Sequence, residues 1–184
     1  MPFSPAALGA VEPAYAEAMS RPAPEPLAPG QESVWDYPRP PRVERWDARV
    51  VVRFGGVVIV DTTDVVRVLE TSHPPVYYLP SAAFLPGSLV PAAGSSFCEY
   101  KGSASYLDIV GGGGVTASRG AWTYPSPSPG YESIVGRVAL YAGPMDEVTL
   151  DDEVVVPQPG GFYGGWITSA IAGPFKGIPG SRGW

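Results

Sequence analysis

Short runs of β-branched and aromatic residues, separated by turn-forming residues, occupy the middle of the chain. The clearest example is RVVVRFGGVVIVDTTD (49–64), whose pattern predicts a strand, a Gly-Gly hairpin turn and a second strand. Sustained periodicity of about 3.6 residues, the mark of an amphipathic helix, is almost absent. The predicted class is therefore mainly β. Further strands are predicted at 65–70, 74–80, 95–110, 117–125, 137–143 and 146–156.

The terminal segments show a different pattern, in which aromatic residues are spaced by proline and glycine. Residues 1–31 are rich in Pro and Ala and are predicted to form a disordered or mobile tail. Residues 32–48 include WDYPRPP, an extended arm expected to dock on its own core, over a site or on a second copy. The β domain is predicted at 49–156, and residues 157–184 form a Gly-rich, aromatic tail that wraps around it.

Composition adds limits on location and partners without changing the predicted fold. Glycine and proline contribute 23 residues each, but 45% of the 184 residues are hydrophobic, which is enough for a core. The formal net charge is −6 and no cluster of Lys and Arg is present, so neither nucleic-acid nor membrane binding is expected. The start lacks the basic region of a signal peptide, and no run reaches the roughly 20 apolar residues of a membrane helix. We therefore expect a cytoplasmic protein.

Metal and cofactor chemistry find little support in the sequence. The chain has one cysteine, Cys98, and one histidine, His73, which cannot supply the usual Cys and His ligands of a structural zinc site. Phosphate-loop, HExxH and GxSxG motifs are absent. No metal site and no cofactor are predicted. Cys98 is expected to be a buried, inert thiol, and His73, in a loop before two prolines, is expected to be incidental.

The segment SSFCEYKGSASY (95–106) leaves the role of its lysine open. Taken as one strand, it places Lys101 beside Glu99 on a polar face, which favours a lysine in solvent. Gly102 changes this expectation, because a glycine inside a strand often marks a bulge or a close approach by another backbone or a ligand. A bulge at this position would move Lys101 to a different face.

Glu70 lies at the end of the strand VVRVLE, where it continues a face made of valines. If this carboxylate is buried, it needs a cationic partner. Lys101 and Arg67 are the candidate partners. A buried Glu–Lys pair is either a structural ion pair or the centre of an acid/base site, and the sequence leaves both open.

Aromatic residues concentrate on the predicted strands and on the turns beside them. Core packing explains them adequately. In the alternative interpretation they form the walls of a pocket for a flat or cationic ligand. The residues concerned are Tyr78, Tyr100, Tyr106, Trp122 and Tyr124.

Four segments, RVLETSHPPVYYLP, FCEYKGSASY, AWTYPSPSPG and IVGRVALY, occur in an order and spacing that resemble the bacterial domain-of-unknown-function family numbered 427. The resemblance covers roughly residues 49–150. It implies two antiparallel sheets that meet at an angle, similar to the β-tent fold, without the four-cysteine zinc site that many β-tent proteins carry. The family is also labelled a nucleotidyltransferase, but no segment here resembles the paired metal-binding carboxylates and Gly-Ser loop of such enzymes.

The family resemblance also favours a functional lysine, because the YKG tripeptide forms part of the family's signature. We therefore predict a cytoplasmic small-molecule-binding β domain with a pocket at the sheet junction. Lys101 and Glu70 are its catalytic candidates, and the five aromatic residues named above bind the ligand. Whether it is an enzyme is left open. The alternative is a non-catalytic interaction or dimerisation module, with a homodimer formed through the terminal segments. Nucleotidyl transfer is the weakest of the three hypotheses.

Overall fold

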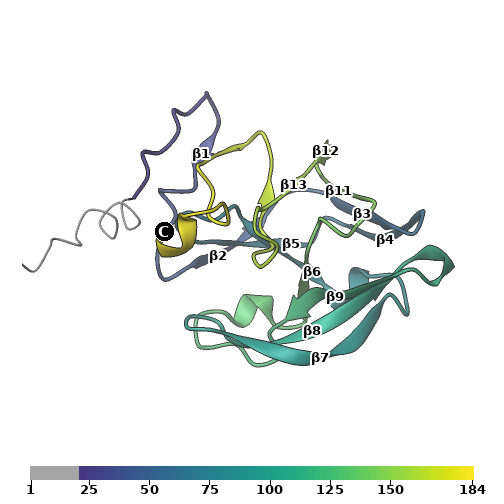
Figure 1. The fold of residues 1–184 in the computed structure, drawn as a ribbon. Helices are drawn as coiled ribbons and strands as arrows, with labels where there is room; N and C mark the ends of the chain where they lie inside the picture. Colours follow the sequence, from purple (N-terminus) through teal and green to yellow (C-terminus); the bar gives the residue numbers. More distant parts are fainter. Residues whose placement is uncertain (1–20) are drawn as a thin grey trace, which may run out of the picture.

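The strands of the computed structural model, which describes residues 21–184, are short and numerous (Figure 1). The described part of the chain is mainly β, as the sequence predicts, and contains no helix long and apolar enough to cross a membrane. Residues 1–20 of the predicted tail lie outside the described residues. The strands are β1 (Glu32–Ser33), β2 (Arg42–Trp46), β3 (Val50–Phe54), β4 (Val57–Thr62), β5 (Val65–Leu69), β6 (Val76–Pro80), β7 (Leu89–Cys98), β8 (Gly102–Val110), β9 (Thr116–Thr123), β10 (Arg137–Leu140), β11 (Glu147–Leu150), β12 (Glu153–Val154), β13 (Val156–Pro157), β14 (Trp166–Ile167) and β15 (Ile171–Ala172). Single turns of 3₁₀ helix lie at Ser81–Ala83, Gly112–Gly114, Glu132–Ile134 and Ser181–Gly183.

Most strands belong to two antiparallel sheets. The larger sheet has the order β2-β5-β6-β10-β9-β8-β7, and the smaller has the order β12-β11-β3-β4. In Figure 1, β7, β8 and β9 form the lower layer, and β3, β4 and β11 lie above them. Two further pairs, β1 with β15 and β13 with β14, lie in the terminal segments.

The hairpin of β3 and β4 follows the prediction from the Gly-Gly pair. Gly55 and Gly56 have φ angles of 63° and 74°, in the left-handed region that glycine adopts without steric cost. Local turn chemistry therefore determines this part of the smaller sheet.

Residues 95–110 are not the single strand that their pattern predicts. β7 ends at Cys98 and β8 begins at Gly102, and these two residues pair with each other across a tight antiparallel turn. Gly102 has a φ of 92°, which side chains other than hydrogen rarely allow. Lys101 therefore lies in a turn and not on the polar face of a strand. β7 also begins at Leu89, in a region where no strand is predicted.

The middle strands of the larger sheet, β5, β6 and β10, are buried on both faces, and this determines where a site can form. Tyr77 and Leu79 of β6 belong to a core that also contains residues of the smaller sheet. Tyr78, between them, points to the opposite face and joins a second cluster with Trp122. The second cluster is rich in aromatic residues, and it borders the cavity described below.

The two terminal segments pack on each other and on the sheets. β1 pairs with β15 in parallel, and the buried Trp35 donates its indole N–H to the Pro174 carbonyl at 2.9 Å. Tyr37 is also buried, and its hydroxyl donates to Glu32 at 2.7 Å. β2, which the sequence assigns to the arm, is the edge strand of the larger sheet and pairs with β5.

Candidate functional site

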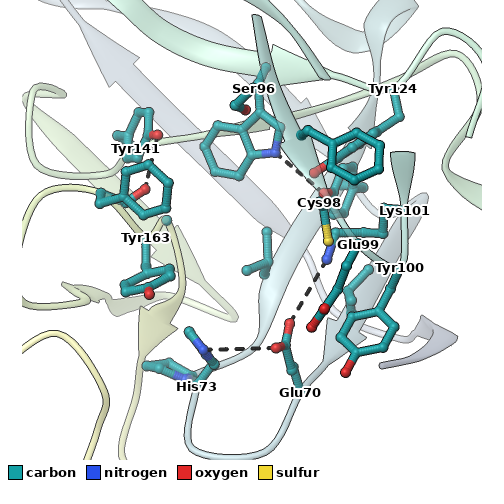
Figure 2. A pocket seen from close by; sticks show the side chains of 18 of the residues that line it. Glu70, His73, Ser96, Cys98, Glu99, Tyr100, Lys101, Tyr124, Tyr141 and Tyr163 are labelled. Carbon is teal, nitrogen blue, oxygen red and sulfur yellow. Dashed lines mark hydrogen bonds and ion pairs between the residues drawn. The ribbon is translucent and has the colours of Figure 1, made fainter. Parts of the chain in front are cut away.

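A cavity of about 490 Å³ lies beside the aromatic second cluster. Residues of β5 to β9 and of the turns beside them form one part of its wall, and residues 162–164 with Lys176 form another. The structure brings all the site residues predicted from the sequence onto this wall, although their roles stay predictions (Figure 2). They are Glu70, Tyr78, Tyr100, Lys101, Tyr106, Trp122 and Tyr124.

The pairing register of the strands positions the aromatic side chains in the apolar part of the wall. Tyr106 of β8 pairs with Trp122 of β9, so their side chains are neighbours on one face of the sheet. The Trp122 indole N–H donates to the Tyr78 hydroxyl at 3.3 Å, and the ring centroids of Tyr78 and Tyr124 are 6.5 Å apart. These four side chains are buried, and burial raises the pKa of Tyr78 and of Tyr124 above the ordinary tyrosine value. This apolar part of the wall is therefore uncharged at neutral pH.

The turn between β7 and β8 carries the remaining residues of this side. Tyr100 is only partly buried, unlike Tyr78, Tyr106, Trp122 and Tyr124. Cys98, expected to be fully buried, is a partly buried free thiol on the cavity wall.

Glu70 follows the last residue of β5 and stands among basic side chains. Its Oε2 is 3.9 Å from Lys101 Nζ, and its Oε1 is 3.4 Å from Arg39 Nε and 4.0 Å from His73 Nε2. Only 11% of the Lys101 side chain and 23% of the Glu70 side chain are exposed. The lysine is thus mostly withdrawn from water and faces the carboxylate, in contrast to the solvated lysine that strand alternation favours. Arg67, the other candidate partner of Glu70, instead forms ion pairs with two other glutamates.

His73 also belongs to this cluster, although the sequence analysis expects it to be incidental. It is 7% exposed, and its Nδ1 lies 3.0 Å from Gln158 Nε2. The Gln158 amide is oriented by the backbone, because Oε1 accepts from the Gly165 N–H at 3.1 Å and Nε2 donates to the Lys176 carbonyl at 2.8 Å. Nδ1 must therefore accept a hydrogen bond, which places the proton of the neutral ring on Nε2, facing Glu70.

Burial, together with the nearby Lys176, Arg39 and Lys101, lowers the pKa of His73 to about 3. The histidine is consequently neutral at physiological pH and carries its N–H on Nε2, where it can donate to a ligand. The ring of Tyr163 packs edge-on against it, with centroids 4.6 Å apart.

Lys176 is the second basic residue of the cavity that the sequence did not identify. Its Nζ donates to the Trp184 main-chain oxygen at 2.7 Å, and burial together with Arg39 lowers its pKa. One signal was available: Phe175-Lys176-Gly177 repeats the aromatic-Lys-Gly pattern of Tyr100-Lys101-Gly102, and both glycines have positive φ angles, 119° and 92°. In each case the lysine precedes a turn that only glycine makes easily.

A second cavity, of about 510 Å³, lies on the other side of residues 162–164. The two cavities share Tyr106, Tyr141 and these three residues. The Tyr141 hydroxyl donates to the Phe162 carbonyl at 3.2 Å, which holds this partition in place. Within residues 21–184, no group of three or more His, Cys, Asp or Glu side chains is arranged to hold a metal ion.

The sequence was also compared with known proteins. A family model labelled NTP_transf_9 and described as a domain of unknown function (DUF427) matches residues 42–151. A search of curated proteins found no match. The matched range contains Glu70, His73 and Lys101, whereas Arg39, Gln158 and Lys176 lie outside it.

Proposed function

This chain belongs to the DUF427 family, a domain of unknown function, and on that premise we propose that it is a cytoplasmic small-molecule-binding β domain. Lys101 and Glu70 act on the ligand, and aromatic side chains hold it. One observation carries the proposal: the residues singled out by the sequence come from separate strands and turns, and they converge on one cavity of about 490 Å³. The aromatic residues are Tyr78, Tyr100, Tyr106, Trp122 and Tyr124.

The size and lining of the cavity support a small ligand with a flat ring. Its volume falls within the range of roughly 300–1,000 Å³ that is typical of small-molecule sites. The walls combine neutral aromatic faces with a few polar groups at one end, and such faces stack well on planar rings. Trp122 and Tyr106 are cross-strand neighbours on this wall, where Tyr141 packs on Trp122 with ring centroids 4.7 Å apart and the Arg119 guanidinium lies 4.0 Å over the Tyr106 ring.

The polar end supports acid/base chemistry. Lys101 Nζ and Glu70 Oε2 are 3.9 Å apart, too far for a direct hydrogen bond and close enough to contact the same ligand atom or two adjacent ones. An ammonium donates a proton and a carboxylate accepts one, so the pair contains both functions of a proton-transfer site. Glu70 also orients the lysine by its charge.

The proposal is tested by native mass spectrometry of freshly purified protein, followed by a thermal-shift screen against a metabolite library. We expect a co-purifying small molecule, and at least one compound that raises Tm. Lys101→Ala should melt near the wild-type temperature and lose the response to that compound. Arg45→Ala is the control, because the Arg45 side chain is 80% exposed and does not line the cavity, and it should keep the response. A folded Lys101→Ala protein that keeps every ligand response contradicts the site assignment.

The dimerisation hypothesis has one observation in its favour. Trp35 and Tyr37 are buried against their own chain, but Phe162 of the C-terminal segment is 66% exposed. Phe162→Ser should then convert a dimer into a monomer in sedimentation experiments. A wild-type protein that sediments as a monomer at all concentrations would rule this function out.

Nucleotidyl transfer, the function in the family's label, is the third hypothesis. No step is proposed for it. Calorimetry with ATP and Mg²⁺ is the direct test, and metal-dependent binding that persists in Lys101→Ala would favour it over the function proposed above.

A further inference from the structure

The polar end of the cavity contains hydrogen-bond donors that no acceptor in the described structure satisfies. Three donors approach Glu70, at 3.4 Å from Arg39, 3.9 Å from Lys101 and 4.0 Å from His73, and none of these contacts is a hydrogen bond. Arg39 instead donates to the main-chain oxygens of Thr71 and Trp184, which leaves Lys101 Nζ and His73 Nε2 as the donors without an acceptor among residues 21–184. Within residues 21–184 the Lys101 ammonium makes no hydrogen bond at all. The Lys101 side chain is 11% exposed and lines the cavity, so water or a ligand in the cavity is the acceptor open to its ammonium. Half-buried donors of this kind require acceptors.

The charges at this end are also unbalanced. Arg39, Lys101 and Lys176 carry positive charge, and Glu70 supplies the opposing carboxylate beside them. Glu99, the other acidic residue on the cavity wall, is exposed at the surface. With both Glu70 and Glu99 counted against the three basic side chains, the group carries one net positive charge, within a chain whose formal net charge is −6. This net positive charge would attract an anion to the cavity.

The His73 ring adds a neutral donor to this cationic group. Gln158 holds its Nδ1 at 3.0 Å as an acceptor, so that Nε2–H points toward Glu70 and the cavity. Lys176 is fixed close by, since its main-chain N–H donates to the Ser72 carbonyl at 2.8 Å. Donors from three separate segments thus converge beside one aromatic wall.

We propose that the ligand of this cavity is a planar ring that bears an oxyanion, either a carboxylate or a phosphate. The oxyanion accepts hydrogen bonds from Lys101 Nζ and His73 Nε2–H, and the positive charges of Arg39 and Lys176 attract it. The ring packs against the aromatic wall that contains Trp122. This inference rests on the proposed small-molecule function and names the class of ligand. The competing class is a cation held by the aromatic wall and Glu70.

The test uses the full chain and isothermal titration with four probes: benzoate, phenyl phosphate, uncharged benzamide and phenyltrimethylammonium. We expect one or both oxyanions to bind at least about tenfold more tightly than benzamide, the scale of one charge-assisted hydrogen bond. Comparing benzoate with phenyl phosphate tells which oxyanion the site takes. Lys101→Met should abolish this preference without changing benzamide binding. Arg45→Met, at a side chain outside the cavity, is the matched control and should leave all four affinities unchanged.

Glu70→Gln separates the anion from the cation hypothesis. Removing the carboxylate's charge should tighten benzoate binding at least about threefold, because it takes away a repulsion. Preferential binding of phenyltrimethylammonium, weakened in Glu70→Gln, would overturn the inference in favour of a cation site. Equal binding of benzamide and both oxyanions would overturn it too, while leaving the small-molecule function supported. If no probe binds and nothing co-purifies, the inference and the proposed function fail together.

Discussion

Lowering the pH from 7 to 5 is expected to destabilise the folded protein through His73, the single histidine of the chain. Burial and the surrounding cations Lys176, Arg39 and Lys101 lower its pKa from 6.5 to about 3 in the folded state. In the unfolded chain the histidine binds a proton as the pH falls through 6.5, whereas the folded protein resists protonation down to about pH 3. Stability therefore decreases as the pH falls through this interval, and it is unaffected by His73 above it.

The magnitude follows from the width of the interval. About 3.5 pH units at about 1.4 kcal/mol each correspond to about 5 kcal/mol for the whole interval. Between pH 7 and pH 5 the expected loss is about 2 kcal/mol, because only the part below 6.5 contributes. Most carboxylates titrate below pH 5, so this window isolates the histidine.

Urea unfolding followed by tryptophan fluorescence at pH 7 and pH 5 measures the loss. His73→Asn is the matched variant, because the Asn carbonyl can replace Nδ1 as the acceptor for Gln158 and asparagine does not titrate. This variant is expected to show less than about 0.5 kcal/mol of change between the two pH values. A wild-type protein with equal stability at both pH values, or a variant with the same loss as wild type, would refute the reasoning.

Two further predictions concern packing and charge. A Cβ at Gly164 would overlap the Trp122 ring, so Gly164→Ala should lower the free energy of unfolding in urea by about 2 kcal/mol. Gly143→Ala is the control, because the nearest atom to a Cβ there is at 3.9 Å, and it should cost less than about 0.5 kcal/mol. Equal costs for the two variants would contradict the close contact. The Arg67 side chain is 5% exposed and pairs with two glutamates, so Arg67→Met should cost at least about 2 kcal/mol by the same assay. Exposed Arg45 is the control, and a similarly large cost for Arg45→Met would argue against a special role for burial.

Local turn chemistry made part of this fold predictable. The β3–β4 hairpin followed from Gly55 and Gly56, because a two-glycine turn strongly restricts how the flanking strands pair. The turn between Cys98 and Gly102 was missed, since the alternation of polar and apolar residues continues through it and conceals the reversal. Gly102 was the one local sign of that reversal, and it was interpreted as a bulge.

The candidate site was predictable only where it lies within the family's sequence blocks. The sequence offered Lys101 and Arg67 as candidate partners of Glu70, and the turn between β7 and β8 brings Lys101 to 3.9 Å from it. His73 was set aside, because its position depends on Gln158, which is 85 residues further along the chain. Lys176 lies at the cavity because of the way the C-terminal segment folds back. The local pattern of polar and apolar residues does not predict contacts between segments so far apart in the sequence.

In the C-terminal segment, the residue that anchors the segment to the core differs from the residues that line the cavity. Trp166 is 1% exposed and anchors the segment, with its indole N–H donating to the Leu140 carbonyl at 3.2 Å. Phe162 and Tyr163, a few residues before it, lie on the cavity wall and outside the range that the family model matches. Selection can therefore alter the wall without touching the anchor or the sheets. The proposed site thus has two parts: the matched range supplies Lys101 and Glu70, and the C-terminal segment supplies part of the wall. Substitutions at Phe162 and Tyr163 are therefore expected to change ligand preference while leaving the Lys–Glu pair in place.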